Sequence, residues 1–288
     1  MSFNIVVLAK QVPDTKNISG KVMKEDGTVN RAALPAIFNP EDLNALEEAL
    51  KIKEKYGAKV TVITMGPPNA AEILRESLYR GADDVVLISD RKFAGSDTLA
   101  TSYILSLAIK KLGQFDIILA GRQAIDGDTA QVGPQTAEKL KINQVSSVDK
   151  IIEVTTNYVV VEHSLVDGYE VVKTKLPVLL TITSEANTPR PPSVKKILKY
   201  KNIVTELEKK NYDEDYIDSD KRKKDFIKVF NIETIGADPA YCGLSGSPTK
   251  VKKIESVVLE SASVKKIENT EEGYRSLIKE LMEEHILG

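Results

Sequence analysis

The sequence has few of the side chains from which proteins build metal centres and covalent active sites. Its 288 residues include one cysteine, Cys242, and two histidines, His163 and His285. One cysteine excludes an intrachain disulfide, a cysteine-ligated iron–sulfur cluster and a thiolate zinc site, and two distant histidines exclude a histidine-rich metal site. We expect no metal site, no catalytic side chain and structural roles for both histidines. Any redox chemistry must then come from a bound organic cofactor.

The sequence also lacks a surplus of charge and a long apolar run. Lys and Arg total 40 against 42 Asp and Glu, so the cations on which nonspecific nucleic-acid binding depends are not in excess. The first apolar run, residues 5–9, is too short for a signal-peptide core or a membrane-spanning helix. We therefore expect a cytoplasmic protein with no nucleic-acid partner and no membrane insertion.

Short apolar runs typical of buried strands alternate with helical periods in the first 140 residues. The runs lie at 5–9, 60–64, 85–88 and 117–120, and the helical periods at 39–57, 70–81 and 97–113. This alternation predicts an α/β fold with a doubly wound, mostly parallel, Rossmann-like sheet. Ligands of such sheets bind beyond the carboxyl ends of the strands. Neither G-x-G-x-x-G after the first strand nor G-x-x-x-x-G-K-[ST] is present.

The pattern changes near residue 150. Alternation in residues 151–162 and 169–175, around the turn Asp167-Gly168, predicts a hairpin, and residues 179–182 predict one more strand. The prolines of residues 188–192 interrupt regular structure and indicate a linker. We therefore end a nucleotide-binding α/β domain, residues 1–190, at this linker.

The remaining residues, 191–288, are expected to form the linker and a C-terminal arm. Residues 195–228 are rich in both charges and poor in large apolar side chains. This composition leaves open either a solvated surface or an arm laid across a partner. A last amphipathic helix is expected at about residues 270–286.

The loop after the fourth strand, residues 121–134, gives the strongest indication of a ligand. Gly121, Gly127 and Ala130 have small side chains that let a ligand approach the backbone closely. The helix that follows offers free N–H groups and the positive end of its dipole, which suit a phosphate group.

Two acids of this loop, Asp126 and Asp128, are suited to accept hydrogen bonds from ribose hydroxyls. The alternative is a tight surface turn with Asp126-Gly127 at its tip, in which Asp128 or Thr129 caps the next helix. A calcium loop is disfavoured because the later ligand positions lack acids.

Several segments follow, in order, the pattern of one family. They are residues 7–14 (VLAKQVPD), 39–40 (NP) before 46–49 (LEEA), 65–67 (MGP), 121–134, and 167–170 (DGYE) before 176–181 (LPVLLT). Together they resemble the electron-transfer flavoprotein beta subunit family, and the loop is similar to that family's nucleotide-binding loop. The resemblance implies that the Rossmann-like sheet is of the adenine-nucleotide-binding type. The family usually has Lys or Arg where this chain has His163, which argues against a role for that position.

Within that family the loop distinguishes two kinds of beta subunit. Subunits that only carry electrons usually contain A-I-D-D-D-x-N-Q-T and hold AMP. Here Gly127 replaces a carboxylate and Ala130 an amide, which resembles the electron-bifurcating branch, whose beta subunit holds a second FAD and receives hydride from NADH. Residues 243–249 also look like that branch. Both replacements free space and one removes a negative charge, as a larger and more anionic ligand than AMP requires.

The resemblance implies the beta subunit of a heterodimer that binds FAD and exchanges hydride with NAD in electron bifurcation or confurcation, and that is not active alone. The implied partners are the alpha subunit, wrapped by residues 191–288, a ferredoxin or flavodoxin, and a flavin-containing dehydrogenase of the acyl-CoA dehydrogenase or FAD-dependent 2-hydroxyacid dehydrogenase type. Two alternatives stay open: a non-bifurcating carrier with structural AMP, and a nucleotide-sensing or nucleotide-hydrolysing protein on the same fold. No phosphate-loop lysine or metal-binding acid pair supports hydrolysis.

Matching the family residue by residue gives the expected cofactor contacts. They are Leu8, Ala9, Asn39, Pro40, Glu41, Asp42, Met65, Gly66, Gly121, Arg122, Gln123, Ala124, Ile125, Asp126, Gly127, Asp128, Thr129, Ala130, Gln131 and Val132. Asp97 and Thr98 begin a helix beyond a strand end and offer a phosphate or ribose contact, or simply an N-cap.

A docking segment is implied after the proline-rich linker. In the family an aliphatic side chain there inserts into the dehydrogenase, and it aligns with Val194, with Ile197 and Leu198 beside it. The alternative is an ordinary amphipathic helix whose buried face carries Ile197 and Leu198.

Overall fold

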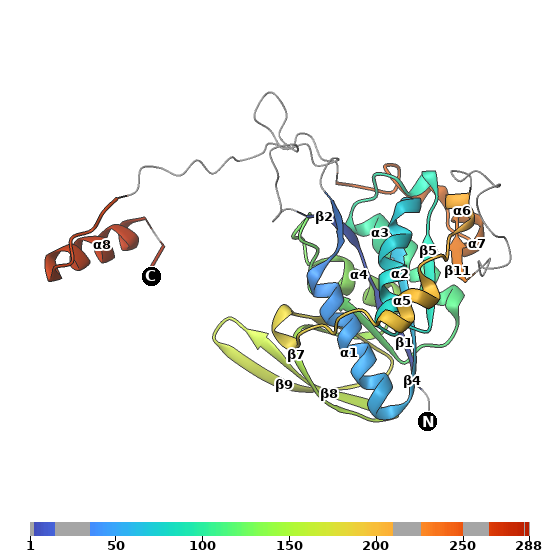
Figure 1. The fold of residues 1–288 in the computed structure, drawn as a ribbon, viewed down its shortest axis with the longest axis horizontal. Coiled ribbons are helices and arrows are strands. Elements are labelled where there is room, and N and C mark those ends of the chain that lie inside the picture. The colour runs from blue at the N-terminus through green and yellow to red at the C-terminus, as the bar shows by residue number, and fades with distance from the viewer. Residues whose placement is uncertain (1–2, 15–34, 210–225, 250–264, 285, 288) are drawn as a thin grey trace.

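A nine-stranded sheet forms the centre of the molecule (Figure 1). The computed structural model describes residues 3–14, 35–209, 226–249, 265–284 and 286–287. In spatial order the strands are β11 (Ile227–Phe230), β5 (Asp84–Ile88), β4 (Ala58–Met65), β1 (Phe3–Leu8), β6 (Ile117–Gly121), β10 (Val178–Ile182), β7 (Asn143–Val154), β8 (Tyr158–Leu165) and β9 (Gly168–Lys175). The strands from β11 to β7 pair in parallel, and β8 and β9 continue the sheet antiparallel. The expected α/β fold with a mostly parallel sheet is confirmed.

Helices cover both faces of the parallel strands. The α-helices are α1 (Pro40–Tyr56), α2 (Ala71–Arg80), α3 (Thr98–Leu112), α4 (Val132–Leu140), α5 (Val194–Tyr200), α6 (Glu206–Lys209), α7 (Ile232–Ile235) and α8 (Glu271–Glu283), and the 3-10 helices η3 (Pro68–Ala70), η4 (Arg91–Phe93), η5 (Ser184–Ala186) and η7 (Pro239–Tyr241). Helices α1 and α2 pack on one face, and α3 and α4 on the other. In β1, Val7 enters the first core and Val6 the second. A strand buried on both faces has to be apolar throughout, which explains the continuous run in the sequence.

The order of the strands reverses at β1. The chain places β4 and β5 on one side of β1, and then returns to place β6, β10 and β7 on the other side. The loops after β1 and β6 therefore leave the sheet in different directions at its carboxyl edge. Open α/β sheets bind ligands in the crevice that forms at such a point.

The first helix shows how the sequence sets these boundaries. Asn39 precedes α1, Pro40 occupies its first turn, and Gly57 ends it with φ 72° and an N–H that donates to the carbonyl of Lys53. Leu46 and Leu50, on the face expected to be apolar, are buried against the sheet. The side chain of Asn39 makes no cap hydrogen bond, because it bonds elsewhere, as described below.

The antiparallel extension contains the expected hairpin, but its first predicted strand, residues 151–162, is divided between β7 and β8. Strands β8 and β9 pair around the turn, with Leu165 opposite Gly168. The expected strand at residues 179–182 is β10, which lies between β6 and β7. A separate antiparallel pair, β2 (Gln11–Pro13) and β3 (Ala36–Phe38), follows β1 and precedes α1.

Part of the charge-rich segment packs into the α/β body. Ile203 and Ile227 are almost fully buried in its core, and the rings of Tyr200 and Phe226 lie 5.3 Å apart. Strand β11 pairs with β5 at the edge of the sheet. These apolar side chains are too few to form a core of their own, and they complete the existing one instead. The domain boundary at residue 190 stays a prediction, and residues 210–225 lie outside the described residues.

The expected C-terminal helix is present as α8, with Tyr274, Ile278 and Met282 exposed. In Figure 1 it lies apart from the sheet and its covering helices. His285 falls outside the described residues. In the described part of the chain, no helix combines the length and the apolar character needed to cross a membrane.

Candidate functional site

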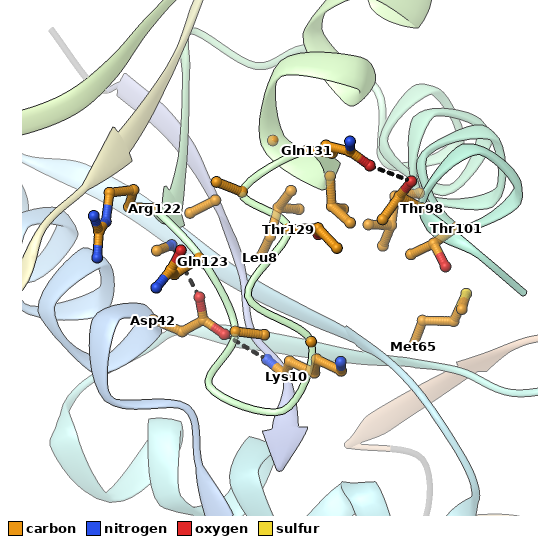
Figure 2. A pocket seen from close by; sticks show the side chains of 18 of the residues that line it. Leu8, Lys10, Asp42, Met65, Thr98, Thr101, Arg122, Gln123, Thr129 and Gln131 are labelled. Carbon is orange, nitrogen blue, oxygen red and sulfur yellow. Dashed lines mark hydrogen bonds between the residues drawn. The ribbon is translucent and has the colours of Figure 1, made fainter. Parts of the chain in front are cut away.

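A cavity of about 320 Å³ opens at the carboxyl ends of β1, β4 and β6, at the point where the strand order reverses (Figure 2). Leu8, Met65 and Leu105 give it an apolar part. One wall comes from residues 96–101 and the other from residues 120–133. Its volume is at the lower end of the range of small-molecule sites.

The first turn of α1 holds the wall that follows β6. Asn39 is fully buried, its amide nitrogen donates to the carbonyl of Gln123 at 2.9 Å, and its amide oxygen accepts from the N–H of Ile125 at 3.1 Å. Glu41 accepts from the N–H of Gln123 at 2.8 Å and from the guanidinium of Arg122 at 3.0 Å. Both residues thus shape the loop from behind.

Asp42 joins the ends of two strands. Its carboxylate accepts from the N–H of Lys10 at 2.8 Å and from the N–H of Gly121 at 2.9 Å, and it also lines the cavity. Burial raises the pKa of Asp42 to about 7, against the two N–H donors, which favour the charged form. Gly121 has to be glycine here, because a Cβ would lie 2.5 Å from the Asp42 oxygen.

The loop beyond Gly121 holds two residues in the left-handed region. Asp128 has φ 47° and Ala130 has φ 53°, conformations that cost free energy outside glycine. Helix α4 begins after Gln131, and no side chain caps it. The alternative of Asp128 or Thr129 as a cap is therefore wrong, and the first turn of α4 keeps free N–H groups beside the cavity.

Two side-chain contacts cross the rim of the cavity. The ammonium group of Lys10 lies 2.7 Å from both carboxylate oxygens of Asp126. The hydroxyl of Thr98 donates to the amide oxygen of Gln131 at 2.9 Å, and Figure 2 shows these two side chains meeting. The first contact ties the loop after β6 to the residues that follow β1, and the second ties it to α3.

Asp97 acts as an N-cap. One of its oxygens accepts from the N–H of Ala100 at 3.0 Å and the other from the N–H of Thr249 at 3.0 Å. Burial alone raises the pKa of Asp97, but these backbone donors hold it below its ordinary value. The N-cap alternative is thus confirmed, although Asp97 and Thr98 also line the cavity.

Most of the expected cofactor contacts line this cavity. They are Leu8, Ala9, Asp42, Met65, Asp97, Thr98, Gly121, Arg122, Gln123, Ala124, Gly127, Asp128, Thr129, Ala130, Gln131 and Val132. Those that do not are Asn39, Pro40, Glu41, Gly66, Ile125 and Asp126. Sequence reasoning missed the lining residues Lys10, Ser96, Thr101, Leu105, Ala120 and Gly133. Three of them could have been predicted from the sequence. Thr101 and Leu105 follow Asp97 at intervals of four residues and therefore share its face of α3. Lys10 follows the end of β1, where a ligand was expected.

The expected docking segment forms α5. Val194 is 72 % exposed and Leu198 65 %, four residues apart on the outer face, and Ile197 is half-buried. The alternative of a buried face is not borne out: Leu198 is exposed, and no residue of α5 is fully buried. The N–H of Ser193 donates to the carbonyl of Tyr79, which ties the start of α5 to α2.

The histidine and the cysteine that the structure describes, His163 and Cys242, belong to no cluster of potential metal ligands. No group of three His, Cys, Asp or Glu side chains among the described residues could hold a metal ion. His163 lies 3.5 Å from Glu170 on the hairpin. Cys242 is buried, and its burial raises the pKa of the thiol.

The chain matches the family described as electron transfer flavoprotein domain over residues 26–208. It is 44% identical over 284 residues to the electron transfer flavoprotein subunit beta of Thermoanaerobacterium thermosaccharolyticum, covering 99% of this chain and 100% of the relative. It is 43% identical over 286 residues to the caffeyl-CoA reductase-Etf complex subunit CarD of Acetobacterium woodii, covering 98% and 99%. It is 39% identical over 285 residues to protein FixA of Sinorhizobium fredii, covering 97% and 92%. Similarity along nearly the whole chain shows that it belongs to the electron transfer flavoprotein beta subunit family.

Proposed function

We propose that this electron transfer flavoprotein beta chain binds FAD in the cavity beside β1 and β6 and exchanges hydride with NAD in electron bifurcation or confurcation. The observation that carries the proposal is the environment of Gly127. It lines the cavity, and a Cβ built on it meets nothing within 4 Å. The loop thus has free space, and no carboxylate, where the AMP-holding form of the loop has an acid.

The lining fits a flavin nucleotide. The hydroxyls of Thr98 and Thr101 and the free N–H groups of α4 suit phosphate and ribose oxygens, and Leu8 and Met65 suit a planar ring. Bound FAD would supply the redox chemistry, since a flavin takes up hydride as two electrons and passes them on singly.

The chain's own part is binding, orientation and exclusion of water. The described lining contains no histidine and no cysteine. Lys10 supplies a cation at the rim, where it faces Asp126 and lies within reach of an anionic ligand. The buried network of Asn39, Glu41 and Asp42 fixes the loop before a ligand arrives, which lowers the ordering cost of binding.

The names of the relatives and the exposed face of α5 support the proposed partners. One relative is named as a subunit of a caffeyl-CoA reductase-Etf complex, and another as the electron transfer subunit gamma of an acryloyl-CoA reductase. We propose an alpha subunit, wrapped by the C-terminal residues, a flavin-containing dehydrogenase and a ferredoxin or flavodoxin as partners in the cytoplasm. The exposed pair Val194 and Leu198, beside Lys195 and Lys199, fits an apolar pocket with an acidic rim on the dehydrogenase.

Cofactor counting tests the proposal. The chain is co-expressed with an electron transfer flavoprotein alpha subunit, and the nucleotides released from the purified heterodimer are quantified by chromatography. We expect two FAD per heterodimer, and reduction of flavin by NADH that delivers electrons to ferredoxin. Absence of flavin would refute the function, and two FAD without any reduction by NADH would refute the bifurcating role.

The second candidate is a non-bifurcating carrier with AMP in this cavity. It is supported by the volume of about 320 Å³, which is at the lower end for ligand sites and suits a mononucleotide. One FAD and one AMP per heterodimer would establish this alternative.

A further inference from the structure

The cavity wall at residues 96–98 rests on a segment from the C-terminal part of the chain. We propose that residues 242–249, which we name the clip, position Asp97, and that ligand binding in the cavity is energetically coupled to attachment of the clip. This inference rests on the proposed nucleotide site and goes beyond it, because none of the clip residues lines the cavity.

Asp97 is held by the clip through its backbone and its side chain. The hydroxyl of Ser247 accepts from the N–H of Asp97 at 2.8 Å and donates to the carbonyl of Gly243 at 2.6 Å. The N–H of Thr249 donates to a carboxylate oxygen of Asp97 at 3.0 Å. Ser247 is only 5 % exposed, so removal of its hydroxyl leaves the N–H of Asp97 without this acceptor in a water-poor place.

The clip also contacts residues 92–96, which lead into the cavity wall at residues 96–98. The N–H of Gly243 donates to the hydroxyl oxygen of Ser96 at 3.1 Å. Gly243 has φ 55°, and a Cβ on it would overlap the carbonyl oxygen of Lys92 and lie 2.9 Å from that of Ala94. Only glycine permits this approach, so the close contact is a property of the sequence and not of a chance surface encounter.

Asp97 transmits the position of the clip to the cavity. Its second carboxylate oxygen caps α3 through the N–H of Ala100. The next residue, Thr98, lines the cavity and bonds Gln131 across the rim. Loosening of the clip therefore frees the start of α3 and the contact that joins both walls.

Coupling of this kind acts in both directions. A ligand that contacts the walls binds more tightly when the clip holds them in place. By linkage, the same ligand must then favour the attached clip by the same factor. Occupancy of the cavity is thereby sensed by the segment that leads towards the C-terminal helix.

Binding measurements on the heterodimer test the positioning role, with FAD and AMP as the probes. Ser247→Ala removes the acceptor. Asp97→Asn keeps a good N-cap for α3 but turns an amide N–H₂ towards the N–H of Thr249. We expect both variants to weaken binding of the probe about tenfold, which corresponds to 1.4 kcal/mol. Ser245→Ala, an exposed change in the same segment, should bind as the wild type does.

Hydrogen exchange on the unmodified heterodimer tests the coupling without any variant. We expect amide exchange in residues 242–249 to slow when saturating FAD or AMP is added to protein stripped of nucleotide. Unchanged exchange in a wild type that binds the probe, or wild-type affinity in Ser247→Ala, would overturn the inference alone. A wild type that binds neither probe would overturn the proposed function and this inference with it.

Discussion

Replacement of Asp42 by asparagine should change how stability depends on pH. The pKa of this buried carboxyl is raised from 3.8 to about 7 in the folded chain. Between these two values the folded chain holds a proton that the unfolded chain releases. The free energy of unfolding of the wild type therefore falls as pH rises through this window, and it levels off above pH 7.

The raised pKa of Asp42 sets the size of this change in the free energy of unfolding. A shift of roughly three units at 1.36 kcal/mol each amounts to about 4 kcal/mol in total, of which about 2–3 kcal/mol is lost between pH 5 and pH 8. Asp42→Asn cannot titrate, so this loss should be absent. The single amide oxygen of the asparagine can accept from the N–H of Lys10 or from that of Gly121, but not from both. Its amide N–H₂ then faces the remaining N–H, and this unsatisfied donor lowers the free energy of unfolding by about 1–3 kcal/mol at every pH.

Urea unfolding followed by circular dichroism at pH 5, 6, 7 and 8 measures both profiles. The chain suits the assay because it has only two histidines, the side chains that ordinarily titrate in this range. Asp167→Asn, on the exposed hairpin turn, is the matched control and should keep the wild-type slope. Parallel profiles for the wild type and Asp42→Asn would refute the reasoning.

Three other substitutions test the cavity and the docking helix. Gly127→Asp should weaken FAD binding about five- to tenfold, because a carboxylate repels the diphosphate at a cost on the order of 1 kcal/mol. Gly127→Asn, which adds similar volume without charge, should bind as the wild type does. Equal effects of the two substitutions on FAD binding would contradict a charge mechanism. Gly121→Ala should lower the free energy of unfolding by about 1–3 kcal/mol through the clash with Asp42, and Gly127→Ala, which meets open space, should be near neutral in the same urea titration. Val194→Ala should slow electron transfer to the dehydrogenase and leave flavin content and reduction by NADH unchanged; an equal loss of NADH reduction would show that Val194 packs the fold.

The sheet and its ligand edge were predictable because they depend on local patterns. A strand buried on both faces has to be apolar throughout, and residues 5–9 and 117–120 meet that condition. The alternation with helices then fixes a parallel sheet, and small residues after residue 120 mark the loop that a ligand approaches. These inferences need no knowledge of which distant side chains meet.

The roles of individual polar residues were not predictable, because they depend on contacts between distant parts of the chain. Asn39 stands where a helix cap belongs, yet its side chain bonds Gln123 and Ile125, more than 80 residues away. Asp126 was expected to meet ribose, yet it pairs with Lys10. Neither partner can be identified from spacing. The tertiary fold decides which of several possible hydrogen bonds such a residue makes.

The same contacts explain how a site with acids in its lining and at its rim can suit an anionic ligand. Asp126 is paired with a lysine, and Asp97 is surrounded by backbone N–H donors. Asp42 carries a proton over part of the physiological range, because burial raises its pKa to about 7. These three acids therefore repel a diphosphate less than a free carboxylate would, which leaves Asp128 as the other acid of the lining. At Gly127 nothing lies within 4 Å of a Cβ, so a carboxylate there would have no such compensation, and its absence from this loop favours the more anionic ligand.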